Sequence, residues 1–88
     1  MTVSEFNEKY KDYLGEGHYG LSIDNQEIID YLDIIFEDLV KIKEFKYYQI
    51  KLKYGYPRVY LTGVSTHMAR TIELYLKSII EDINDSKK

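Results

Sequence analysis

The sequence predicts an α+β domain in which three helices pack on one face of a small antiparallel sheet. Apolar residues recur at helical spacing over about residues 25–42 and 66–83, and apolar and polar residues alternate between them over 46–62. A shorter helical segment lies near the start of the chain. The predicted order is therefore helix, helix, hairpin, helix, within a single domain that spans all 88 residues, 1–88.

The composition is that of an ordinary globular protein, with 44% hydrophobic residues, 31% charged residues and a formal charge of -3. The chain has no cysteine, which excludes thiolate chemistry and fits a reducing compartment. No apolar run approaches the length of a membrane span, and the start lacks the pattern of a signal peptide. We therefore expect a cytoplasmic protein that does not bind membranes.

The first helix is expected over about residues 5–14. Ser4 is suited to be its N-cap, because a serine hydroxyl can accept a free backbone N–H of the first turn. Phe6, Tyr10 and Leu14 fall on one side at helical spacing. Gly15 is expected to end this helix, since glycine accepts the left-handed conformation found after helix ends.

The loop GEGHYG, residues 15–20, matches the letters of the dinucleotide-binding pattern GxGxxG. That pattern requires a strand before it and a helix that begins inside it. Here a helix precedes the loop, the next helix starts near residue 25, and Glu16 would repel a pyrophosphate. We therefore interpret the segment as a loop of tight turns. The alternation of Tyr19, Leu21 and Ile23 indicates a short edge strand after it.

The second helix has a clear start, because Asp24 and Glu27 have the spacing of a capping box. Its core stripe consists of Ile28, Leu32, Ile35, Leu39 and Ile42, widened by Ile29 and Phe36. Four acids lie largely away from that stripe and form a secondary candidate face: Asp30, Asp33, Glu37 and Asp38. Such a face is either a solvated helix surface or a docking surface for a basic partner.

Residues 46–62 predict a β-hairpin, with its turn at Gly55. A two-residue loop at Gly55–Tyr56, or a four-residue loop around it, sets Lys53 opposite Arg58 and Lys51 opposite Tyr60. Residues directly opposite share a face, so one face is apolar and the other collects polar residues and cations. The exposed face is the main candidate binding site and carries, with Thr62, the residues Tyr47, Gln49, Lys51, Lys53, Arg58 and Tyr60.

The pair of Lys53 and Arg58 is unfavourable by itself, because like charges directly opposite each other repel. Two interpretations remain open for this concentration of cations in an acidic chain. Lysines on an exposed strand discourage edge-to-edge aggregation, which is a structural role. Alternatively, the cations bind an anionic partner.

The third helix is expected over about residues 66–83, with Ser65 as its N-cap. Its core stripe consists of Met68, Ile72, Leu76, Ile79 and Ile83.

No constellation for catalysis is recognisable in the sequence. The two histidines, His18 and His67, lack nearby partners, and adjacent residues such as Ser65 and His67 do not face each other on a helix. Scattered carboxylates do not provide convergent metal ligands. We therefore expect no enzymatic activity, no metal site and no cofactor.

The segment QIKLKYGYPRVY, residues 49–60, resembles a hairpin motif of small uncharacterised phage and prophage proteins, roughly Q-[IV]-K-E-K-F-G-x-L-R-F-Y. The positions that match it are Gln49, Ile50, Lys51, Lys53, Gly55, Arg58 and Tyr60. This chain departs from the motif at Leu52, Tyr54, Pro57 and Val59. Over about residues 15–80 the likeness is looser, and the C-x-x-C-G segment that many members carry is absent.

The resemblance implies a phage or mobile-element origin and no established activity. Taken with the residues, it favours a small non-catalytic protein that binds and modulates a host protein, such as an anti-defence or host-takeover inhibitor. The alternative is a binder of single-stranded nucleic acid or of a phosphorylated small ligand, because tyrosines and cations on a sheet can stack on bases and contact phosphates. A homodimer contact through Tyr47, Tyr56 and Tyr60 also remains open.

Overall fold

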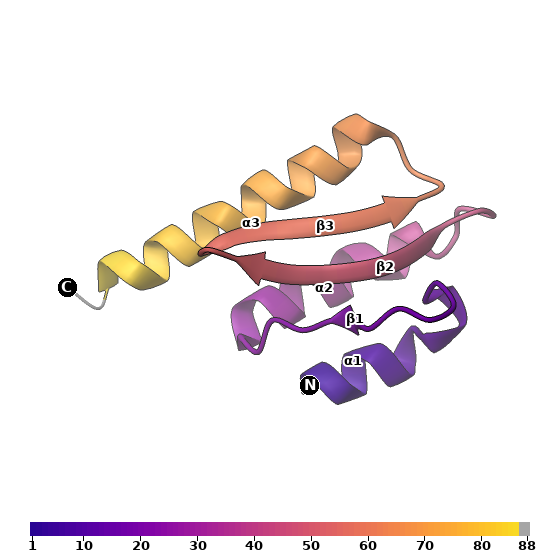
Figure 1. Cartoon of the computed structure of the whole chain (residues 1–88), viewed down its shortest axis with the longest axis horizontal. Helices are drawn as coiled ribbons and strands as arrows, with labels where there is room; N and C mark the ends of the chain where they lie inside the picture. The colour runs from indigo at the N-terminus through magenta and orange to yellow at the C-terminus, as the bar shows by residue number, and fades with distance from the viewer. Residues whose placement is uncertain (87–88) are drawn as a thin grey trace.

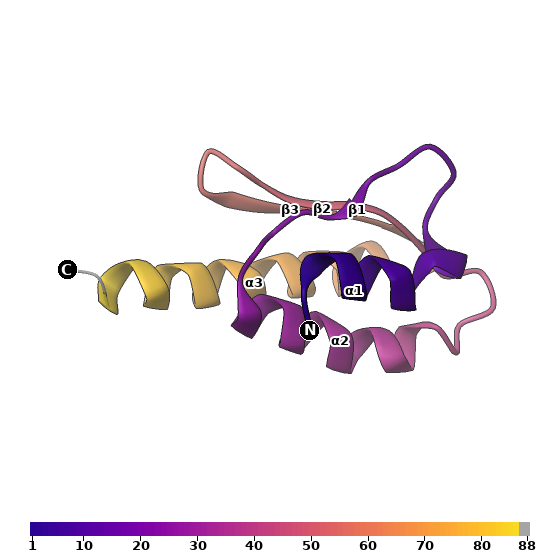
Figure 2. The same cartoon turned by 90° about the horizontal axis from the view of Figure 1, so that it is seen from below.

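The computed structural model describes residues 1–86, and residues 87 and 88 lie outside the described part. Three helices lie on one face of a three-stranded sheet and leave its other face open (Figures 1 and 2). The elements are α1 (Val3–Lys9), the 3-10 helix η1 (Lys11–Tyr13), β1 (Gly20–Leu21), α2 (Gln26–Leu39), β2 (Lys46–Lys53), β3 (Tyr56–Thr62) and α3 (Thr66–Ser86).

The sheet has the strand order β1-β2-β3, and β2 and β3 form the hairpin. The predicted α+β class and the order helix, helix, hairpin, helix are confirmed. The prediction of a purely antiparallel sheet is wrong, because the short strand β1 pairs with β2 in parallel. Parallel neighbours need a crossover connection rather than a tight turn, and α2 provides that crossover.

The helix starts follow local capping chemistry, in part at other residues than expected. In α1, Thr2 and Glu5 exchange two hydrogen bonds of a capping box, so the helix begins before Ser4. In α2, the Asn25 side chain rather than Asp24 accepts a hydrogen bond from the Ile28 N–H, at 3.0 Å. In α3, Ser65 accepts from the Met68 N–H at 3.1 Å, as predicted.

The helix ends also differ from the predicted boundaries. The chain leaves α1 after Lys9 and continues as η1, where a single helix over 5–14 was expected. Helix α2 ends at Leu39 rather than near Ile42, and α3 continues past the expected residue 83 to Ser86.

The hairpin turns at Tyr54 and Gly55, which have positive φ angles of 55° and 76°. Two such residues form the turn whose twist suits a two-residue hairpin loop. The turn sets Lys53 opposite Tyr56 and Lys51 opposite Arg58. The predicted pairing of Lys53 with Arg58 is therefore wrong. Gln49, Lys51, Lys53, Arg58 and Tyr60 keep their predicted face, but Tyr54 moves from the apolar strand series into the turn, and Tyr56 moves from the turn into β3.

A β-bulge interrupts β2 between Tyr47 and Gln49. The extra residue, Tyr48, shifts the alternation of side chains by one position. Tyr47 therefore faces the core, where it is 0% exposed. The prediction of Tyr47 as a binding-face residue is wrong for this reason.

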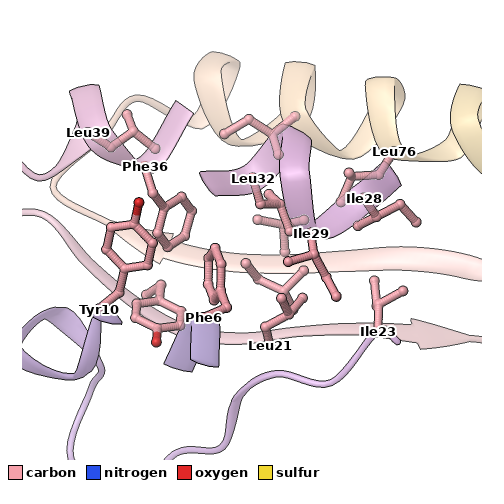
Figure 3. Close-up of a cluster of buried hydrophobic side chains, with 14 of the residues drawn as sticks. Phe6, Tyr10, Leu21, Ile23, Ile28, Ile29, Leu32, Phe36, Leu39 and Leu76 are labelled. Carbon is pink, nitrogen blue, oxygen red and sulfur yellow. The ribbon is translucent and has the colours of Figure 1, made fainter. Parts of the chain in front are cut away.

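One hydrophobic core lies between the sheet and the helices (Figure 3). Phe6 and Phe36 meet at its centre, with ring centroids 5.0 Å apart, and the Tyr10 ring lies 4.8 Å from Phe6. Most of the predicted helix stripes contribute to it. Two predicted members, Ile42 and Met68, are 40% and 43% exposed instead. Ile42 lies beyond the end of α2, and Met68 lines a surface hollow between α2 and α3.

Both edges of the sheet are capped by side chains. Beside β1, the Asn7 amide donates to the Leu21 carbonyl and accepts from the Leu21 N–H, both at 2.9 Å. Beside β3, Glu73 of α3 accepts from the Val59 N–H at 3.1 Å. Pro57 lies two residues before Val59, so its backbone nitrogen faces the same outer edge. Because proline has no N–H, no unpaired donor remains at that position. These devices reduce the unpaired backbone that an edge strand presents.

Within residues 1–86, no helix is both long and apolar enough to cross a membrane.

Candidate functional site

The open face is defined here as six of the residues that β2 and β3 present on the side away from the helices. They form three directly opposed pairs, which are Gln49 with Tyr60, Lys51 with Arg58, and Lys53 with Tyr56. The hairpin thus brings together five of the six predicted binding residues, adds Tyr56 and leaves out Tyr47. Figure 2 shows that the helices lie on the opposite side.

The three cations of the open face have no anionic partner among residues 1–86. In the described part of the chain, the ion pairs are formed by Lys9, Lys11, Lys41 and Lys77, and by neither Lys51, Lys53 nor Arg58. Lys51 stands directly opposite Arg58, an arrangement that costs a few tenths of a kcal/mol up to about 1. Internal stability therefore does not account for this pair.

The aromatic side chains of the open face are about half exposed to solvent. Tyr60 is 51% exposed and Tyr56 is 45% exposed. The Lys77 ammonium lies 4.6 Å from the centre of the Tyr56 ring, in a cation–π contact. Interaction with Tyr56, and further with Glu81, raises the pKa of Lys77. Lys77 thus adds a cation at the margin of the open face.

A groove adjoins the open face along β3 and the first turns of α3. It has a volume of about 530 Å³. Gln49 and Tyr60 belong to both the open face and the groove. The other lining residues are His18, Tyr48, Val59, Leu61, Thr62, Val64, Ser65, Thr66 and Ala69.

Tyr48, the bulge residue, is held in place on three sides. Its ring packs directly on Gly15, where an added Cβ would lie 2.1 Å from a ring carbon. His18 meets the ring edge-on at 5.0 Å, and the Tyr48 hydroxyl is 3.2 Å from the Thr62 hydroxyl. The loop GEGHYG therefore helps to build the groove and opens no helix of the kind that nucleotide binding requires.

The groove was not predicted from the sequence, because the bulge at Tyr48 was not predicted. The signal was present in the apolar positions, which run Phe45, Tyr47, then Ile50 and Leu52. The step from Tyr47 to Ile50 is three residues, whereas the steps on either side are two. One inserted residue in a strand produces this shift of the alternation.

The acidic face of α2 is largely engaged inside the molecule. Lys9 pairs with Asp33 at 2.8 Å and with Glu37 at 3.1 Å, and the Tyr10 hydroxyl donates to Asp33. Burial alone would raise the pKa of Asp33, but the hydrogen bonds from Lys9 and Tyr10 hold it below its ordinary value.

The remaining two acids of this face also have neighbours. Asp38 pairs with Lys41 at 3.3 Å, and Asp30 accepts from the Gln26 amide at 2.7 Å. The secondary candidate face thus joins α1 to α2 and offers fewer free charges than the open face does.

The part of the chain that the structure describes contains no group of three or more His, Asp or Glu side chains placed to hold a metal ion. Ser65 caps α3, and the neighbouring His67 is exposed.

Comparison of this chain with protein-family models, with curated proteins and with solved structures found no significant match.

Proposed function

We propose that this chain is a small non-catalytic binding domain that docks its open face on an acidic surface of another protein. One observation carries the proposal: Lys51, Lys53 and Arg58 stand together on the uncovered side of the sheet, without an anionic partner among the described residues. Exposed Tyr56 and Tyr60 flank them. Tyrosine and arginine are enriched in protein interfaces, where tyrosine supplies apolar area with a polar tip.

The charge of the open face supports a different protein as the partner over a second copy. A two-fold dimer through the open face would bring Lys51 and Arg58 of both copies together, and like charges across an interface are unfavourable. The resemblance to phage proteins supports a bacterial host protein as the partner, and modulation of that protein as the effect.

Nucleic acid or a phosphorylated small ligand is the second candidate for the same face. It is favoured by the half-exposed ring of Tyr60, which lies on the same face as Lys51 and Arg58 and could stack on a base. The formal charge of -3 weighs against it, because nucleic-acid-binding domains are commonly basic.

A capture experiment with a charge-reversed variant tests the proposal. The bait is the wild-type chain or the triple variant K51E/K53E/R58E, and bacterial lysate is applied with and without nuclease. We expect a protein that survives nuclease treatment and is lost with the variant. Its affinity, measured afterwards with purified components, should fall moderately with salt, because an aromatic contact persists when charges are screened.

The matched control is K11E/K41E/K43E, which makes the same charge change in η1 and in the α2–β2 connection, off the sheet. The ion pairs of Lys11 and Lys41 are exposed and contribute little to stability. Circular dichroism must show that both variants fold. Capture that both variants lose equally would contradict a role for the open face. A nuclease-sensitive signal with a steep salt dependence would favour the second candidate instead.

A further inference from the structure

The groove beside the open face differs from it in chemistry. Among the described residues that line the groove, none is a carboxylate, lysine or arginine. Its walls combine apolar side chains such as Val59 and Leu61 with the neutral hydroxyls of Thr62 and Ser65. A pocket of about 530 Å³ is within the usual range of about 300–1,000 Å³ for sites that enclose a small ligand. It therefore suits a bulky uncharged group.

The groove and the open face form one continuous surface, because Gln49 and Tyr60 are shared between them. A partner segment that lies across the cations would reach the groove at these two residues. The Tyr48 side chain, which lines the groove, is already held in place by Gly15, His18 and Thr62. A preformed pocket loses little side-chain freedom on binding, which favours its use as an anchor point.

We propose that the partner presents an extended acidic peptide segment whose one bulky apolar side chain fills the groove, while its carboxylates contact Lys51, Lys53 and Arg58. This inference rests on the proposed function and specifies it. Charge complementarity selects an acidic segment for the open face. The uncharged lining of the groove selects an aromatic or large aliphatic residue next to the acids.

A displayed library of random linear peptides, selected on the 88-residue chain, tests this inference without knowledge of the partner. We expect selected sequences to combine several acids with one large apolar residue at a constant distance from them. A synthetic fluorescent peptide of the selected consensus then gives affinities for the variants. Truncation of its apolar residue to alanine should weaken binding at least about tenfold, as loss of a buried anchor does.

A variant whose added side chain fills the groove gives the decisive test. Ala69 lines the groove on α3, so A69F occupies it, and S78F adds the same ring at an exposed position of α3 outside the groove. We expect A69F to weaken the consensus peptide at least about tenfold and S78F to leave it unchanged. If A69F does not fold by circular dichroism, T66F replaces it, because Thr66 is an exposed lining residue.

The outcomes separate this inference from the proposed function. Acid-rich peptides that depend on the three cations, but lack an apolar position or ignore the filled groove, would overturn the inference alone. Selected peptides that lack acidic residues would overturn the proposed function as well. So would a consensus peptide that binds K51E/K53E/R58E as tightly as the wild-type chain. Tight binding of a single-stranded oligothymidylate at low salt, lost in the same triple variant and not matched by any peptide, would replace both with nucleic-acid recognition.

Discussion

At the scale of single residues, Asn7 has a role that its place on a short helix does not suggest. Its amide pairs with both backbone groups of Leu21 and its oxygen also accepts from the Tyr47 hydroxyl, at 3.1 Å. One side chain thus does what a further strand would do at the edge of β1. Gly20 leaves room for it, because a Cβ there would lie 2.4 Å from the Asn7 oxygen.

We expect Asn7→Ala to lower the free energy of unfolding by about 2–4 kcal/mol, since it leaves several part-buried polar groups without partners. Urea denaturation followed by circular dichroism measures this. Asn84→Ala, at an exposed position of α3, is the control and should change stability by about 0.5 kcal/mol or less. Equal, small effects of both substitutions would contradict the role of Asn7.

Two tyrosines should make stability sensitive to alkaline pH. Burial and the hydrogen bond to Asp33 raise the pKa of Tyr10 to about 12, and burial raises the pKa of Tyr47 to about 12. A folded-state pKa above the unfolded value of about 10 favours folding below that pH, and this contribution is lost as the pH rises toward about 12. We expect the free energy of unfolding to fall across this window.

Urea denaturation at several alkaline pH values measures the decline, and absorbance titration of phenolate should show Tyr10 and Tyr47 ionising last. The variant Y10F/Y47F should flatten the pH dependence. The control Y19F/Y54F, at positions 81% and 97% exposed, should not. A decline of the same slope in both variants would assign it to other groups.

At the scale of elements, the hairpin turn contains an avoidable strain. Tyr54 adopts a positive φ of 55°, although bulky residues disfavour that region, and its side chain is 97% exposed. Asparagine tolerates the same conformation and forms with Gly55 the Asn-Gly pair that such turns prefer.

We therefore expect Tyr54→Asn to raise the free energy of unfolding by about 0.5–1 kcal/mol. Thermal and urea denaturation both measure this. Tyr19→Asn removes another exposed tyrosine, 81% exposed and without a positive φ, and should give no gain. A gain of the same size at both positions would mean that the removal of exposed tyrosine, rather than the turn, is responsible.

The elements also show which features could be predicted from the sequence. The helices and the hairpin follow from apolar periodicity, and the role of Ser65 as the N-cap of α3 follows from capping chemistry. The exact register did not follow, because a turn centred on Tyr54 and Gly55 uses a tyrosine where turn rules expect asparagine or glycine. The burial of Tyr47 depends on the bulge at Tyr48, which the sequence signals only through the three-residue step from Tyr47 to Ile50.

At the scale of the whole molecule, the parallel placement of β1 could not be predicted from local patterns. It depends on how α2 crosses the sheet and on the Asn7 contact, both of which join segments far apart in the sequence. The candidate open face was largely predictable, because its residues lie within one hairpin. The groove was not, because it depends on the bulge at Tyr48 and because His18 and Ala69, which both line it, lie far apart in the sequence.

In the same topology, β1 is the shortest strand of the sheet. It pairs with β2 over only two residues, and this pairing closes the long connection through α2. We expect the amide hydrogens of Leu21 and Ser22 to exchange faster than those of the β2–β3 ladder, measured by nuclear magnetic resonance in deuterated buffer. Equal protection throughout the sheet would show instead that it opens as one unit.

The alternation of side chains along the hairpin has a consequence for how such a protein changes over generations. Ile50, Pro57 and Val59 fill the core, while their sequence neighbours form the open face. Substitutions at the open face therefore leave the folding residues untouched. Under the proposed function, a lineage facing a changing target could therefore alter its recognition one codon at a time, without first losing a folded protein.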